Sequence, residues 1–107
     1  MKKNYSIKVP LKNNPYEVII GKNILNKCKN KIFSTIKDAK KIFVITDTTI
    51  KKLHFKKLTK IIPKNFLVKT LVISPGEKMK DIKIINKILI FLLKNKISRN
   101  DAIFAFG

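Results

Sequence analysis

The chain begins with two short segments in which apolar and polar residues alternate. In the first, Tyr5, Ile7 and Val9 share one face, which predicts a half-buried strand. The Asn-Asn-Pro sequence at 13–15 predicts a turn, because these residues favour chain reversal. Residues 16–21 then predict a second strand, antiparallel to the first.

A helical pattern follows at residues 24–32, where Ile24, Leu25, Cys28 and Ile32 fall on one side. Cys28 is therefore interpreted as a small buried apolar residue, because nothing in the sequence indicates a partner that would activate its thiol. It is the only cysteine, so this chain alone forms no intrachain disulfide and no cysteine-based zinc site.

Three continuous apolar runs dominate the rest of the chain, at residues 41–46, 66–73 and 102–106. Such runs are typical of strands buried on both faces of a parallel sheet. The intervening segments predict helices, so the order is strand, helix, strand, helix, strand. Right-handed crossovers would place the three strands parallel, with helices on the faces of the sheet. The predicted class is α/β, and the pattern is half of a nucleotide-binding fold.

Two amphipathic helices are expected between these strands. The first opens with Asp47-Thr48-Thr49 and ends at Pro63-Lys64-Asn65, and the second runs from about Met79 to Lys94. The side chains expected to face the sheet are Ile50, Leu53, Leu58 and Ile61 in the first helix, and Met79, Ile82, Ile85, Leu89 and Leu92, widened by Ile88 and Phe91, in the second.

Composition raises a second possibility, because the 107 residues carry a formal net charge of +19. Dense positive charge binds phosphate backbones without sequence preference. However, Arg99 is the only arginine among 25 basic residues, and the lysines are spread along the chain. A protein that recognises nucleic acid would normally bring arginines and clustered aromatic side chains. A solvated lysine coat is favoured, and a basic nucleic-acid-binding module is kept as the alternative from another class.

The sequence also bounds the domain and its location. One domain fits the length, and residues 1–107 are taken as that domain. The last apolar strand closes on Gly107 alone, so we expect a truncation within a larger protein. No apolar leader follows Met1, and the most apolar window, residues 84–93, is too short to span a bilayer. A cytoplasmic protein without a membrane partner is expected.

Candidate chemistry lies at the carboxyl ends of the predicted strands, where open parallel sheets bind ligands. Three segments leave those ends, namely residues 46–49, residues 74–80 and Gly107. Asp47 is the type of residue that accepts hydrogen bonds from ribose hydroxyls, and it is equally suited to cap the following helix. The two roles can coexist.

The turn from Pro75 to Lys80 leaves two interpretations open. Gly76 lets a ligand approach the backbone, Glu77 can bind hydroxyls or an amine, and Lys80 can offset phosphate charge. Alternatively, Glu77 favours the helix dipole and pairs with Lys80 three residues on. His54 is the only histidine and is interpreted as a packing or surface residue, so no Ser-His-Asp triad and no complete His/Cys metal site can be built.

Taken together, these segments resemble the N-terminal region of 3-dehydroquinate synthases. The resemblance rests on Tyr-Glu-Val-Ile-Ile-Gly at 16–21, Val-Ile-Thr-Asp at 44–47, Ile-Ser-Pro-Gly-Glu-Lys-Met-Lys at 73–80 and Asp-Ala-Ile-Phe-Ala-Phe-Gly at 101–107. It spans nearly the whole chain, and the Pro-Gly-Glu-x-x-Lys turn is fairly specific. It favours ligand contact for Glu77 and Lys80. Thr49 departs from the pattern, since many relatives carry Asn there.

The resemblance implies an incomplete Rossmann-like NAD-binding domain, followed in the family by a helical domain that supplies a divalent metal site (zinc or cobalt). It implies a homodimeric carbon-oxygen lyase of the shikimate pathway, which converts 3-deoxy-D-arabino-heptulosonate 7-phosphate to 3-dehydroquinate and phosphate with transient oxidation by NAD. The chain alone is expected to be inactive and to hold no catalytic or metal-binding residue. Another sugar-phosphate cyclase or a glycerol-dehydrogenase-like enzyme is the alternative. The cofactor-binding residues implied are Asp47, Pro75, Gly76, Glu77, Lys78, Met79 and Lys80.

Overall fold

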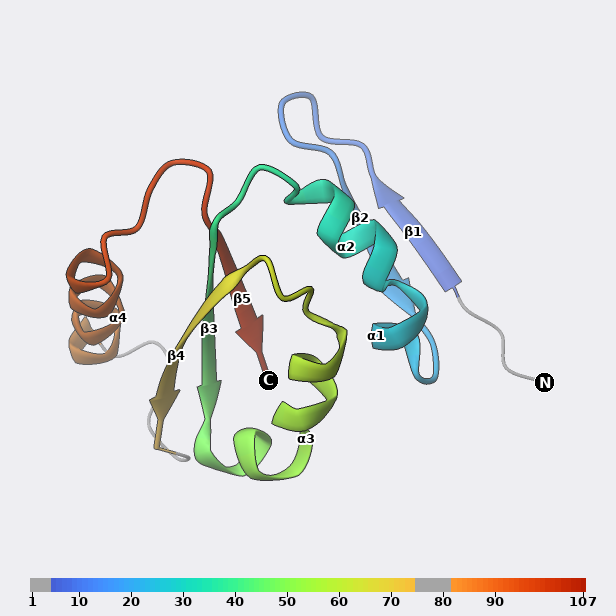
Figure 1. Cartoon of the computed structure of the whole chain (residues 1–107). Helices are drawn as coiled ribbons and strands as arrows, with labels where there is room; N and C mark the ends of the chain where they lie inside the picture. The colour runs from blue at the N-terminus through green and yellow to red at the C-terminus, as the bar shows by residue number, and fades with distance from the viewer. Residues whose placement is uncertain (1–4, 75–81) are drawn as a thin grey trace.

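The computed structural model of the protein describes residues 5–74 and 82–107 (Figure 1). A two-stranded ribbon comes first, and the rest of the chain builds a three-stranded sheet. The predicted α/β class, with a strand pair followed by strand, helix, strand, helix, strand, is confirmed. The elements in chain order are β1 (Tyr5–Val9), β2 (Tyr16–Ile20), α1 (Ile24–Lys27), α2 (Lys29–Thr35), β3 (Lys41–Asp47), α3 (Thr48–Ile61), β4 (Leu67–Ile73), α4 (Ile82–Lys94) and β5 (Ala102–Phe106).

The three-stranded sheet is parallel, as predicted, with β3 between β4 and β5. In its register, Thr46 of β3 lies opposite Val72 of β4 and Phe106 of β5, so all three strands end at the same edge. Helix α3 and the α1–α2 pair lie on one side of the sheet, and α4 lies on the other (Figure 1). This two-sided cover is what a buried parallel sheet requires.

Burial differs among the three strands. β3 is covered on both faces, as predicted, and Ile42, Phe43 and Val44 are fully buried. The prediction of full burial is wrong for β4 and β5, where Leu67 and Ile103 are exposed. Within the described sheet, each of these strands pairs with β3 alone, and an apolar run does not distinguish a central strand from one at an edge.

The main core lies between the sheet and the helices α1, α2 and α3. The Phe33 ring of α2 packs 5.7 Å from the Phe66 ring and 6.2 Å from the Phe104 ring, measured between centroids. Burying a side chain of this kind contributes about 1.5–3 kcal/mol. This core holds β3 rigidly at the centre. Its buried members are Phe33, Ala39, Ile42, Val44, Leu58, Ile62 and Phe66.

The predicted apolar face of α3 is correct in part. Leu58 is only 2% exposed, and Ile50 and Ile61 are half-buried, whereas Leu53 is 61% exposed, contrary to prediction. Five residues separate Leu53 from Leu58, which at 3.6 residues per turn rotates their side chains about 140° apart. The two residues therefore do not share one narrow face.

The predicted face of α4 is correct in part, for Ile88, Phe91 and Leu92. Ile82, Ile85 and Leu89 are exposed, Ile82 by 71%. The helix docks through Phe91, which was among the predicted side chains and whose ring meets the Phe43 ring edge-on at 5.9 Å. Because α4 is apolar nearly all round, the sequence alone does not single out the docking face. The apolar side chains of α4 that are buried or half-buried are Ile84, Ile88, Phe91 and Leu92.

The ribbon is antiparallel as predicted, with Ile7 opposite Val18. Its predicted half-burial is wrong for Tyr5 and Ile7, which are more than half exposed. On the ribbon's other face, Glu17 accepts a hydrogen bond from the Ser6 hydroxyl and forms an ion pair with Lys31.

The predicted helix at 24–32 is interrupted at Cys28, which ends α1 and begins α2 with φ −96° and ψ 2°. Cys28 is half-buried. Leu25 and Ile32 pack on the core from the same side, as predicted. Over residues 5–74 and 82–107, none of the helices has the length and apolar content that crossing a membrane requires.

Candidate strand-end site

The carboxyl ends of the three parallel strands enclose a cavity of about 390 Å³. Because β3, β4 and β5 run in the same direction, the last residues of all three reach this one edge. The volume is within the range of small-molecule sites. Its lining residues are Ile45, Thr46, Asp47, Ile73, Ala105, Phe106 and Gly107.

The strand order places a change of winding direction at this cavity. The chain passes from β3 outward to β4 and then returns across β3 to β5 on the opposite side. The helices that make these two crossovers, α3 and α4, lie on opposite sides of the sheet (Figure 1). The cavity lies at the carboxyl ends of the strands, where this reversal occurs. In open α/β sheets this reversal point is the usual ligand position.

Asp47 lines the cavity and also caps α3. Its Oδ1 accepts a hydrogen bond of 2.7 Å from the Ile50 backbone N–H, and its backbone is extended, with φ −108° and ψ 171°. The capping interpretation is therefore confirmed. In the described part of the chain Oδ2 accepts no hydrogen bond, so this oxygen is free to accept one from a ligand. The cap and a ligand contact are compatible.

Thr46 is a further polar residue at this cavity, and it was not among the predicted site residues. It is 4% exposed, and its Oγ1 is buried with no hydrogen-bond partner among the described residues. More than nine in ten buried polar groups have such a partner. The available signal was a hydroxyl at the end of an otherwise apolar strand, which is weak because threonine is common in strands.

The remaining predicted cofactor contacts are Pro75, Gly76, Glu77, Lys78, Met79 and Lys80, and they lie outside the described residues, as does the predicted packing of Met79. The chain leaves β4 at Ser74, directly after Ile73, which lines the cavity. Of the predicted site, the structure thus brings Asp47 and Gly107 together at one edge.

Asp101 lies before β5, at the opposite edge of the sheet. Its carboxylate accepts hydrogen bonds from the backbone N–H of Lys41, at 3.1 Å, and from that of Ser98, at 2.8 Å. Burial by itself would raise the pKa of Asp101, but the hydrogen bonds from Ser98 and Lys41 outweigh it and lower the pKa below its ordinary value. Asp101 therefore ties β5 to the start of β3, far from the cavity.

Metal binding finds no support in the described part of the chain, where no three His, Cys, Asp or Glu side chains cluster closely enough to hold an ion. The histidine expected to be a packing or surface residue, His54, is half-buried on α3.

The strand order and the strand-end cavity define a doubly wound, Rossmann-like α/β domain with one candidate ligand crevice. No protein-family model matches the chain. Curated sequences do match it, and they are 3-dehydroquinate synthases. That of Clostridium botulinum is 35% identical over 101 residues, which is 92% of this chain and 28% of the relative.

Two further 3-dehydroquinate synthases match the chain over a similar range. The 3-dehydroquinate synthase of Streptococcus thermophilus is 34% identical over 102 residues, covering 94% of this chain and 28% of its own length. That of Brucella anthropi is 28% identical over 103 residues, covering 95% of this chain and 27% of its own length. The resemblance inferred from the motifs is confirmed. The chain spans a little over a quarter of the length of these relatives.

Proposed function

We propose that the chain serves as the NAD-binding part of a 3-dehydroquinate synthase. The observation that carries the proposal is the similarity to these enzymes over more than nine-tenths of the chain. The cavity at the winding reversal supports it, because this is the position at which such sheets bind nucleotides. As an enzyme, the protein would be a carbon-oxygen lyase that acts on the sugar phosphate 3-deoxy-D-arabino-heptulosonate 7-phosphate and releases 3-dehydroquinate and phosphate in the shikimate pathway.

The residues at the cavity fit the ribose of a nucleotide. Asp47 holds α3 through Oδ1, and its Oδ2 accepts no hydrogen bond from residues 5–74 or 82–107, so it can accept one from a ribose hydroxyl without losing the cap. The buried Thr46 hydroxyl, which also lines the cavity, has no hydrogen-bond partner among the described residues. When bound, NAD supplies the transient oxidation that the reaction needs. The part assigned to this chain is to bind and orient the adenosine end.

The divalent metal and the sugar-phosphate site are assigned to regions beyond the residues described above. No step is assigned to a metal on this chain, because the described residues offer no set of three ligands. A cytoplasmic homodimer remains part of the proposal on the strength of the resemblance alone.

A residue-resolved titration tests the proposal. NAD added to the ¹⁵N-labelled chain should shift the backbone signals of residues 45–47 and 105–107, with a dissociation constant in the millimolar range because little of the cofactor is enclosed. Signal shifts confined to other residues would contradict the proposal. So would a lack of any signal shift at saturating NAD. The chain with Asp47→Asn is the matched variant, since asparagine still caps α3.

A further inference from the structure

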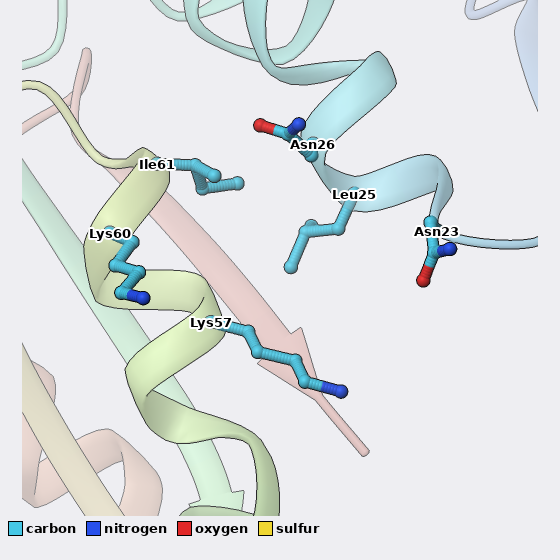
Figure 2. A pocket seen from close by; sticks show the side chains of 6 residues that line it. All are labelled: Asn23, Leu25, Asn26, Lys57, Lys60 and Ile61. Atoms are coloured by element: carbon cyan, nitrogen blue, oxygen red, sulfur yellow. The ribbon is translucent and has the colours of Figure 1, made fainter.

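A second cavity, of about 330 Å³, lies between α1 and the last turns of α3 (Figure 2). Lys60 is 13 residues along the chain from Asp47, which separates this cavity from the strand-end site by about 20 Å along α3 at 1.5 Å per residue. The two cavities share no lining residue. The lining residues of the second are Asn23, Leu25, Asn26, Lys57, Lys60 and Ile61.

The polar groups of this cavity all offer donors to an anion. Lys57 and Lys60 are three residues apart, so their ammonium groups project from neighbouring positions of α3. Asn23 and Asn26 contribute carboxamides from the facing segment. No carboxylate is among the lining residues, and none of these four side chains has a hydrogen-bond or ion-pair partner among residues 5–74 and 82–107.

The remaining walls are apolar. The side chains of Leu25 and Ile61 lie between the two helices, and Lys57 extends from α3 on the side of α1 (Figure 2). Both apolar residues are half-buried. Apolar walls beside two ammonium groups that have no partner among the described residues suit a ligand with an anionic head and an apolar body, because a small inorganic anion would make no contact with Leu25 and Ile61.

The general lysine coat does not account for this arrangement. A lysine in the last turn of α3 also favours the helix dipole, which explains Lys60 but not Lys57. Lys52 and Lys56 lie on the same helix and are also exposed, yet neither is among the residues that line this cavity. They provide a matched comparison within one element.

We propose that the α1–α3 cavity is a binding site for a small organic anion, a phosphate ester or carboxylate carried on an apolar body. The proposal does not rest on the proposed function, because it concerns a different cavity and a different part of α3. Phosphate and carboxylate share the chemistry that the two lysines recognise, and the apolar body selects against the free ion.

Phenyl phosphate, benzoate and inorganic phosphate are the probes, each titrated into the full ¹⁵N-labelled chain at 150 mM salt. Phenyl phosphate should shift the signals of residues 23–26 and 57–61 and should bind about tenfold more tightly than inorganic phosphate, since only the ester buries apolar area on Leu25 and Ile61. Tighter binding of phenyl phosphate than of benzoate identifies the ester as the preferred head, and the reverse identifies the carboxylate.

The double variant Lys57→Gln, Lys60→Gln should weaken phenyl phosphate binding about tenfold, whereas Lys52→Gln, Lys56→Gln should change it less than about twofold. Circular dichroism checks that both variants remain folded. Equal weakening by the two pairs would assign the binding to the lysine coat as a whole. That result, or shifts spread over lysines outside the cavity, or the lack of any saturable shift, would overturn the proposal.

Discussion

Replacement of Asp47 separates its structural role from its proposed ligand role. The Oδ1 bond to the Ile50 N–H, at 2.7 Å, satisfies one of the four backbone donors that the first turn of α3 leaves unpaired. Loss of an N-cap side chain typically costs about 1 kcal/mol, within a range of about 0.5–2 kcal/mol. Asp47→Ala should therefore lower the free energy of unfolding by about that amount.

Asp47→Asn should cost less than Asp47→Ala, and the difference should be largest at high salt. Asparagine keeps an accepting oxygen at the cap, and only the attraction between the carboxylate and the helix dipole is lost, which is about 0.3–1 kcal/mol and is screened by salt. Urea unfolding followed by circular dichroism at 222 nm measures both variants. With a slope of about 1–3 kcal/mol per molar urea, a loss of 1 kcal/mol lowers the midpoint by roughly 0.3–1 M.

The comparison refutes the reasoning if the asparagine variant is as unstable as the alanine variant at high salt. The accepted hydrogen bond would then not be what Asp47 contributes to α3. The carboxylate of Asp47 would then not serve the helix through one oxygen and a ligand through the other.

Three further predictions concern the core, acid stability and turnover. Leu58→Ala should lower the free energy of unfolding by about 2–5 kcal/mol, because Leu58 is only 2% exposed. Leu53 lies on the same helix but is 61% exposed, so Leu53→Ala should lower it by about 0.5 kcal/mol or less. Equal losses for the two variants in chemical denaturation would contradict the observed face of α3. Because the folded pKa of Asp101 is lowered, its stabilising contribution is present above about pH 4 and is lost as the pH falls through that folded pKa; Asp101→Asn should lower stability at pH 7 and flatten its decline below pH 4, and an unchanged acid profile would count against this role. With sugar-phosphate substrate, NAD and zinc, the chain alone should release no phosphate above background, and measurable release would disprove the assignment of the metal and substrate sites to other regions.

The sequence predicted the fold where one pattern had one structural meaning. The continuous run at 41–46 became the central strand, and the Asp-Thr-Thr segment after it began a helix at Thr48. Prediction from the sequence was wrong where a local pattern fits more than one structure and tertiary packing decides between them. Helix α4 is apolar on several faces, so the pattern also assigned Ile82, Ile85 and Leu89 to the sheet, whereas these three side chains are exposed and Phe91 makes the predicted contact.

The candidate site was predictable to the extent that it depends on strand direction. Parallel strands bring Asp47 and Gly107 to one edge whatever their side chains, so the order of elements was sufficient. Thr46 was not predictable, because its importance lies in an unpaired buried hydroxyl, which depends on every neighbour around it. The α1–α3 cavity was not predictable either, because its two walls come from segments more than 30 residues apart in the sequence.

The measurement that most directly tests the central claim compares adenosine with 2′,3′-dideoxyadenosine, two neutral ligands that the lysines do not attract. Residues 45–47 and 105–107 should report both titrations. If Asp47 accepts a ribose hydroxyl, adenosine should bind about tenfold more tightly, as expected for a hydrogen bond to a charged group, and Asp47→Asn should remove most of that preference. Equal affinity of the two nucleosides for the unaltered chain, or shifts away from the strand ends, would contradict the account.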